Sequence, residues 1–138
     1  MHGDYHLANV LYRYDGPALA AIVDWEMCTI GDPLLDLGWL LATWPDPQEP
    51  AATVGAGLAA AGGLPSPDEI VARYAEGSAR DLSAIRWYGV LACFKLGIVL
   101  EGTHARAFAG KAPKPVGDML HASTLGLFRR AHRMMAAS

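Results

Sequence analysis

Hydrophobic and polar positions divide the chain into a short extended region and a longer helical one. Two short apolar runs, residues 10–14 and residues 19–23, are separated by the turn-forming sequence Asp15-Gly16-Pro17. Short apolar runs joined by such a turn predict a β-hairpin. Residues 26–33 show neither strand nor helix periodicity, and we expect a loop there.

After residue 33 the apolar positions follow helical spacing. The leucines of residues 34–41 predict a buried helix that ends near Trp44-Pro45. Ser66-Pro67-Asp68-Glu69 has the features of a helix start: an N-cap residue, a proline and two acids. The pattern predicts about five helices: from residue 34 to near residue 44, then residues 50–61, 66–79, 83–108 and 116–135. We therefore expect a mainly α (α+β) fold in a single domain, 1–138.

Composition narrows the possible partners and location. The 138 residues are 52% apolar with a formal charge of −3, which predicts one folded domain with its own core. The charges are scattered, which argues against nucleic acid as a partner. Residues 90–100 form the most apolar stretch, too short for the roughly 20 residues that cross a bilayer, so no membrane partner is expected. The isolated Cys28 and Cys93 predict buried free thiols, and we expect a cytoplasmic protein.

Candidate chemistry lies in the first 40 residues. Asp4 stands five residues before Asn9 ahead of the first predicted strand, and Asp24 follows the second. Because a hairpin brings its outer ends together, these three side chains can converge. One carboxylate that accepts a hydroxyl proton, with an amide oxygen and a second carboxylate that hold Mg²⁺, is the set that phosphoryl transfer needs.

Three sequence segments carry a family resemblance. They are His2-Gly3-Asp4-Tyr5-His6-Leu7-Ala8-Asn9-Val10-Leu11, Ile22-Val23-Asp24-Trp25-Glu26 and Gly31-Asp32-Pro33-Leu34-Leu35-Asp36-Leu37. Together they closely resemble the aminoglycoside phosphotransferase / choline kinase-like family. The resemblance implies the C-terminal lobe of a protein-kinase-like fold, with the catalytic loop and metal-binding hairpin in residues 1–37 and a helical substrate-side region in residues 38–138.

The resemblance also implies roles for individual residues. Asp4 is expected to be the catalytic base, and Asn9 and Asp24 the Mg²⁺ ligands. His2 and Asp36 are expected to support the catalytic loop, Asp36 through hydrogen bonds to its backbone. Glu26 either contacts the substrate or caps the following loop.

The family's N-terminal nucleotide-binding lobe, with its Gly-rich turn and strand lysine, is absent from the 138 residues. We expect a fragment, an internal start or a truncated gene, and therefore weak or no transfer from ATP or GTP to a small-molecule hydroxyl acceptor. The surface that such a lobe would cover is expected to be buried in a homodimer or a swapped assembly. A helical region with few acids also argues against a polycationic aminoglycoside as the acceptor.

Two other functions are compatible with the sequence. The chain can be a non-catalytic, pseudokinase-like binding module, or, more remotely, a metal-dependent hydrolase that uses His2, Asp4 and His6. We expect His6 to pack beneath the loop. The remaining histidines, His104, His121 and His132, are expected on the surface or on helix faces, and the tryptophans Trp39, Trp44 and Trp87 in the core.

Overall fold

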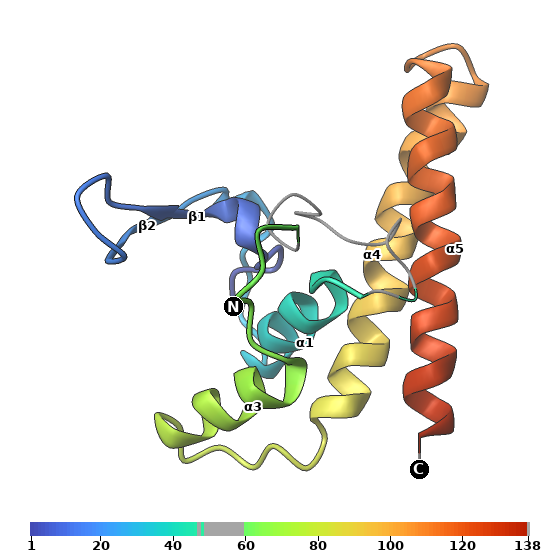
Figure 1. Cartoon of the computed structure of the whole chain (residues 1–138). Helices are drawn as coiled ribbons and strands as arrows, with labels where there is room; N and C mark the ends of the chain where they lie inside the picture. Colours follow the sequence, from blue (N-terminus) through green and yellow to red (C-terminus); the bar gives the residue numbers. More distant parts are fainter. Residues whose placement is uncertain (47, 49–59, 138) are drawn as a thin grey trace.

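The computed structural model describes residues 1–46, 48 and 60–137. Within them the chain is mostly helical, with one antiparallel two-stranded hairpin (Figure 1). The elements are η1 (Leu7–Asn9), β1 (Val10–Tyr12), β2 (Leu19–Ile22), η2 (Trp25–Met27), α1 (Leu34–Thr43), α3 (Pro67–Glu76), α4 (Ile85–Phe108) and α5 (Lys114–Ala136). The mainly α prediction is confirmed. The number of five helices is not, because four have both ends in the described residues and the helix predicted over 50–61 lies outside them, apart from residues 60 and 61.

The hairpin projects from the helical body. Val10 pairs with Ile22 and Leu11 with Ala21, and the register shifts between Leu11 and Tyr12. Its strands are short and largely exposed: Leu11 keeps 48% of its surface accessible and Tyr12 59%. Figure 1 shows the pair extending away from the helices, attached at the end that carries the N-terminal loop and η2.

The core lies where α1 crosses α4 and α4 runs beside α5. Trp39 of α1, Cys93 of α4 and Leu127 of α5 are almost completely buried there. Gly38 allows the first crossing, because a Cβ atom at this position would lie 2.6 Å from the carbonyl oxygen of Tyr88. Leu34, Leu37 and Leu41 form a second cluster on α1, against which α3 packs.

Helix α3 begins as its sequence predicts. The Ser66 side chain accepts a hydrogen bond from the Glu69 backbone N–H, while the Glu69 carboxylate accepts one from Ser66 N at 2.7 Å. This reciprocal capping box satisfies two backbone donors that the helix itself leaves unpaired. The start of the helix is therefore fixed by local chemistry.

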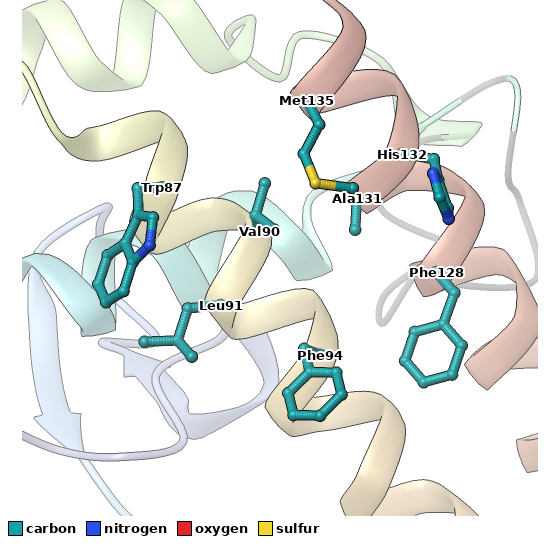
Figure 2. A pocket seen from close by; sticks show the side chains of 8 residues that line it. All are labelled: Trp87, Val90, Leu91, Phe94, Phe128, Ala131, His132 and Met135. Atoms are coloured by element: carbon teal, nitrogen blue, oxygen red, sulfur yellow. The ribbon is translucent and has the colours of Figure 1, made fainter.

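Two burial predictions are wrong. Cys28 is exposed, whereas Cys93 is buried. Trp87 is 59% exposed and lines an apolar groove between α4 and α5 together with Phe94 and Phe128 (Figure 2). Helix α4 is apolar on most of its circumference, so its sequence does not reveal which face packs inward. No helix in the described ranges combines the length and apolarity that crossing a membrane requires.

Candidate active site

The loop before β1 is fixed to α1 by one carboxylate. Asp36, in the first turn of α1, accepts hydrogen bonds from the backbone N–H groups of His2 at 2.6 Å and Gly3 at 2.8 Å. Gly3 has φ +92°, and a Cβ atom there would lie 2.2 Å from the carbonyl oxygen of Met27. Glycine is therefore required where the loop passes η2.

The His2 ring joins the two segments that carry the candidate residues. It is 3% exposed. Its Nδ1 accepts a hydrogen bond from Asp4 N at 3.2 Å, and its Nε2 donates to the carbonyl oxygen of Val23 at 2.8 Å. A backbone N–H can only donate and a carbonyl can only accept, so these partners place the ring proton on Nε2.

Asn9 is held by the same loop. Its side chain is buried, and Nδ2 donates to the carbonyl oxygen of Asp4 at 3.0 Å, with Asp4 Oδ2 at 3.4 Å. The backbone carbonyl oxygen of Asn9 accepts a hydrogen bond from Val23 N at 3.0 Å. Because the amide nitrogen is committed to the loop, Oδ1 is the carboxamide atom that this arrangement leaves for a metal ion.

Asp24 follows Val23 directly, so its backbone lies beside Asn9. It has φ 65° and ψ 57°, and it is the one non-glycine residue with positive φ among the residues that the structure describes. This left-handed conformation costs about 1–2 kcal/mol for a residue with a Cβ atom. Such strain is often found at functional positions. The side chain is exposed and makes no hydrogen bond that caps η2.

The Asp4 carboxylate is partly accessible, with 25% of its side chain exposed. His6 Nε2 lies 3.5 Å from Asp4 Oδ1. His6 Nδ1 accepts a hydrogen bond from Ala8 N at 3.2 Å, so this ring caps η1 as well as packing at the loop. Glu26 lies exposed in η2, two residues after Asp24.

The predicted residues therefore fall into two groups. Hydrogen bonds connect Asp4, Asn9, His2 and Asp36 into one network, and Val23 ties the backbone of Asp24 to it. Glu26 lies beyond this network. Oxygen donors from a carboxamide and a carboxylate fit a hard cation such as Mg²⁺. A zinc site on His2 is disfavoured, because both of its ring nitrogens already bond to the backbone.

Trp25 makes a contact at the site that its sequence does not indicate. Its ring centroid lies 4.6 Å from that of His2, and its Nε1 donates to the carbonyl oxygen of Ile22 at 2.8 Å. The indole thus covers the bridging histidine. The position of Trp25 directly after Asp24 places it near the site, but the sequence does not indicate that its ring contacts the ring of His2.

A hairpin that carries Asp4 and Asn9 before its first strand and Asp24 after its second, set against helices, is consistent with a kinase-like lobe. The chain belongs to the phosphotransferase enzyme family, whose family model matches residues 1–88. The resemblance found in the sequence is therefore confirmed at the level of the family.

The similar curated proteins are much longer than this chain. Acyl-CoA dehydrogenase family member 11 of Pongo abelii is 30% identical over 114 residues, which cover 80% of this chain but 14% of that protein. The Homo sapiens protein of the same name is 29% identical over 116 residues, covering 80% and 14%. Acyl-CoA dehydrogenase family member 10 of Mus musculus is 24% identical over 119 residues, covering 81% and 11%. No solved structure matches the chain significantly.

Proposed function

We propose that this chain is the catalytic lobe of a phosphotransferase that moves the γ-phosphate of ATP or GTP to a hydroxyl group of a small molecule. Its membership of the phosphotransferase family supports the chemistry. The observation that carries the proposal is the His2 ring, whose hydrogen bonds to Asp4 N and Val23 O hold both motif-bearing segments together. Phosphoryl transfer depends mostly on positioning and electrostatics, so a rigid frame of this kind is what it requires.

In this proposal Asp4 orients the attacking hydroxyl and accepts its proton. The partial exposure of the carboxylate leaves room for a substrate oxygen. Asn9 Nδ2 and His6 Nε2 lie near its two oxygens and set the orientation of the carboxylate plane. Glu26, exposed in η2, is then available to contact the acceptor.

Asn9 and Asp24 would hold Mg²⁺ through their side-chain oxygens. When bound, the ion neutralises charge on the β- and γ-phosphates. The Gly-rich turn and strand lysine that bind a nucleotide in this fold are not among the 138 residues. We therefore expect weak or no turnover from this chain alone. ATP and Mg²⁺ as co-substrate and cofactor are consistent with the cytoplasmic location expected from the sequence.

Metal binding tests this proposal without requiring turnover. Mn²⁺ replaces Mg²⁺, and free Mn²⁺ is measured by electron paramagnetic resonance during titration of the chain. We expect a site whose Mn²⁺ affinity falls more than about tenfold in Asp24→Asn, because the ion loses a charged ligand. Asp68→Asn, which removes an exposed acid at the start of α3, is the matched control and should bind as the wild type does. Equal Mn²⁺ binding by wild type and Asp24→Asn would refute the assignment.

A second measurement separates an enzyme from a binding module. Mg²⁺-dependent ATP hydrolysis by the wild type should exceed that of Asp24→Ala if the lobe retains any catalysis. Equal rates together with intact Mn²⁺ binding at Asp24 would favour a non-catalytic, pseudokinase-like module.

A further inference from the structure

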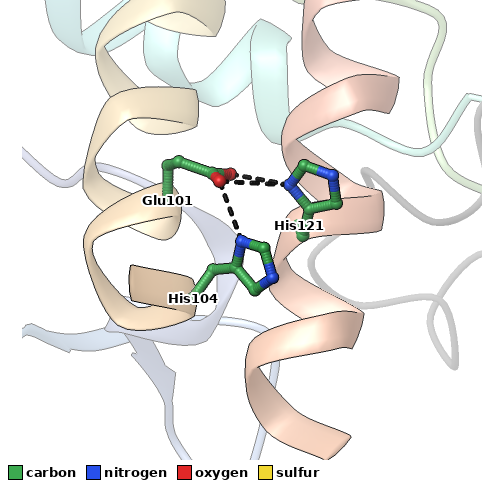
Figure 3. Close-up of side chains that lie close together, drawn as sticks. All are labelled: Glu101, His104 and His121. Carbon is green, nitrogen blue, oxygen red and sulfur yellow. Dashed lines mark hydrogen bonds and ion pairs between the residues drawn. The ribbon is translucent and has the colours of Figure 1, made fainter. Parts of the chain in front are cut away.

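A second cluster of metal-ligand side chains lies far from the hairpin, between α4 and α5. His104 Nδ1 lies 2.8 Å from Glu101 Oε1, and His121 Nδ1 lies 2.9 Å from Glu101 Oε2 (Figure 3). One donor atom from each of the three residues lies within 4.8 Å of the others. The two imidazole rings are stacked, with centroids 4.4 Å apart.

The two helices build this cluster by their spacing and close approach. Glu101 and His104 are three residues apart and share one face of α4. His121 comes from α5, one turn after Gly117. A Cβ atom at Gly117 would lie 2.4 Å from Ala107 Cβ, so the glycine permits the close contact that brings His121 to Glu101. The Phe108 ring lies edge-to-face with the His104 ring, with centroids 5.6 Å apart.

The two Nδ1 atoms lie at hydrogen-bond distances from Glu101, which neutral rings that carry a proton on Nδ1 satisfy; a bound cation would replace those two protons. Both rings turn the same nitrogen, Nδ1, toward one carboxylate. Two imidazolium ions stacked beside a single carboxylate would leave a net positive charge and repel each other. Two neutral rings and a carboxylate instead form a ligand set that zinc takes in proteins. Ligands at zinc bonding distance around a tetrahedral ion lie about 3.3 Å apart, so small side-chain adjustments would admit the ion.

We propose that Glu101, His104 and His121 form a binding site for a zinc-type divalent transition-metal ion that clamps α4 to α5. The His104 side chain is 17% exposed, and those of Glu101 and His121 are each 41% exposed. The ion can therefore enter from solvent, and water can fill the fourth position. Imidazole nitrogens distinguish this site from the all-oxygen Mg²⁺ site proposed at Asn9 and Asp24. The two proposals stand independently of each other.

The test titrates Zn²⁺ into the untagged 138-residue chain in excess Mg²⁺, using a chromophoric zinc indicator as competitor. We expect one equivalent of bound Zn²⁺ and a rise of several degrees in the melting temperature, because the ion binds the folded state alone. In NMR spectra of the wild type, the side-chain signals of His104 and His121 should shift on addition of Zn²⁺. This readout does not depend on any variant folding.

Variants then locate the ion. His121→Ala and Glu101→Gln should each weaken Zn²⁺ binding by more than about tenfold and abolish the thermal shift. His132 is an exposed histidine further along α5, and His132→Ala should leave both the Zn²⁺ affinity and the thermal shift unchanged. His6→Ala tests whether zinc instead binds at the catalytic loop. Three results would each overturn the proposal: no Zn²⁺ binding, unchanged Zn²⁺ binding in His121→Ala, or loss of Zn²⁺ binding in His6→Ala alone. If no Zn²⁺ binds, the three side chains form only a hydrogen-bonded cluster.

Discussion

Residues 3 and 24 both have left-handed backbone conformations, for different physical reasons. Gly3 has φ +92° and lies against the carbonyl oxygen of Met27, so its conformation is a packing requirement of the loop. Asp24 has φ 65° although a Cβ atom makes that conformation costly. At Gly3 the residue type suits the backbone fully, whereas at Asp24 a residue with a Cβ atom adopts a conformation that glycine adopts more easily.

Gly3→Ala tests the packing requirement. The added methyl group would overlap the Met27 carbonyl oxygen, at 2.2 Å, and would also disfavour the positive φ. We expect the variant to lose about 2–4 kcal/mol of unfolding free energy, from backbone strain and from displacement of the loop. Urea denaturation measures this change. Gly16→Ala is the control, because a Cβ atom at Gly16 meets nothing within 4 Å; similar losses in both variants would contradict the explanation.

At the scale of elements, helix α5 holds the end of helix α1. Arg130 of α5 donates to the carbonyl oxygens of Leu41, Ala42 and Trp44, which terminate α1. Its Nε also lies 3.1 Å from Asp46 Oδ2. These bonds satisfy carbonyl groups that the end of α1 cannot pair internally. The guanidinium thus replaces a helix cap with a tertiary contact, which fixes α5 against α1 as well as against α4.

Asp46→Asn should weaken this contact in a pH-dependent manner. Burial tends to raise the pKa of Asp46, but hydrogen bonds from Gln48 N and Arg130 and the charges of Arg130 and Arg133 outweigh it and hold the pKa below its ordinary value. A lowered pKa in the folded state contributes stability above the unfolded pKa of about 3.9, and that stability is lost as the pH falls through the folded pKa.

We therefore expect Asp46→Asn to lose about 2 kcal/mol at pH 7, the scale of hydrogen bonds to charged groups. The difference from wild type should narrow as the pH falls below about 4, because the carboxylate of the unfolded wild type is then protonated while the folded state must still take up a proton. Urea denaturation at both pH values measures this. Asp15→Asn is the matched control, since the Arg13–Asp15 pair is exposed and contributes little. A loss for Asp46→Asn that does not vary with pH would rule out the electrostatic explanation.

The sequence predicted those elements whose determinants are local. The α3 N-cap needs Ser66 and Glu69 alone, and the hairpin needs two apolar runs and a turn. Contacts between elements were not predicted. Glu101 and His121 are twenty residues apart and carry no joint motif, so His121 was expected merely on the surface or on a helix face. The exposure of Trp87 and the left-handed conformation of Asp24 likewise depend on how neighbouring segments pack.

At the scale of the whole molecule, apolar surface is concentrated away from the core. Leu11, Tyr12, Leu19 and Trp25 on and beside the hairpin are 48–59% exposed. Contiguous apolar patches on soluble proteins often mark association sites. This supports the proposal of a homodimer or swapped assembly that buries the hairpin face. The α4–α5 groove is a second apolar surface, on which Phe94 is 55% exposed.

Light scattering coupled to size-exclusion chromatography tests the proposed assembly. We expect a mass that rises from monomer to dimer with concentration, and Leu11→Lys should shift the equilibrium to monomer because a charge would be buried at the interface. Phe94→Lys should leave the mass unchanged if the hairpin mediates the contact. A monomer mass at all concentrations would contradict the proposal. If Phe94→Lys dissociates the dimer and Leu11→Lys does not, the interface lies at the α4–α5 groove instead.

If Asp24 holds a metal ion as proposed, its left-handed backbone places selection for stability and selection for metal binding in opposition. Glycine adopts left-handed conformations without penalty, because it has no Cβ atom. Asp24→Gly would relax the backbone and remove the negative charge that is proposed to hold the metal ion. Selection for stability alone would therefore replace this aspartate over evolutionary time. In descendants that have lost the proposed activity, residue 24 should change early, while Gly3, which packing alone requires, persists.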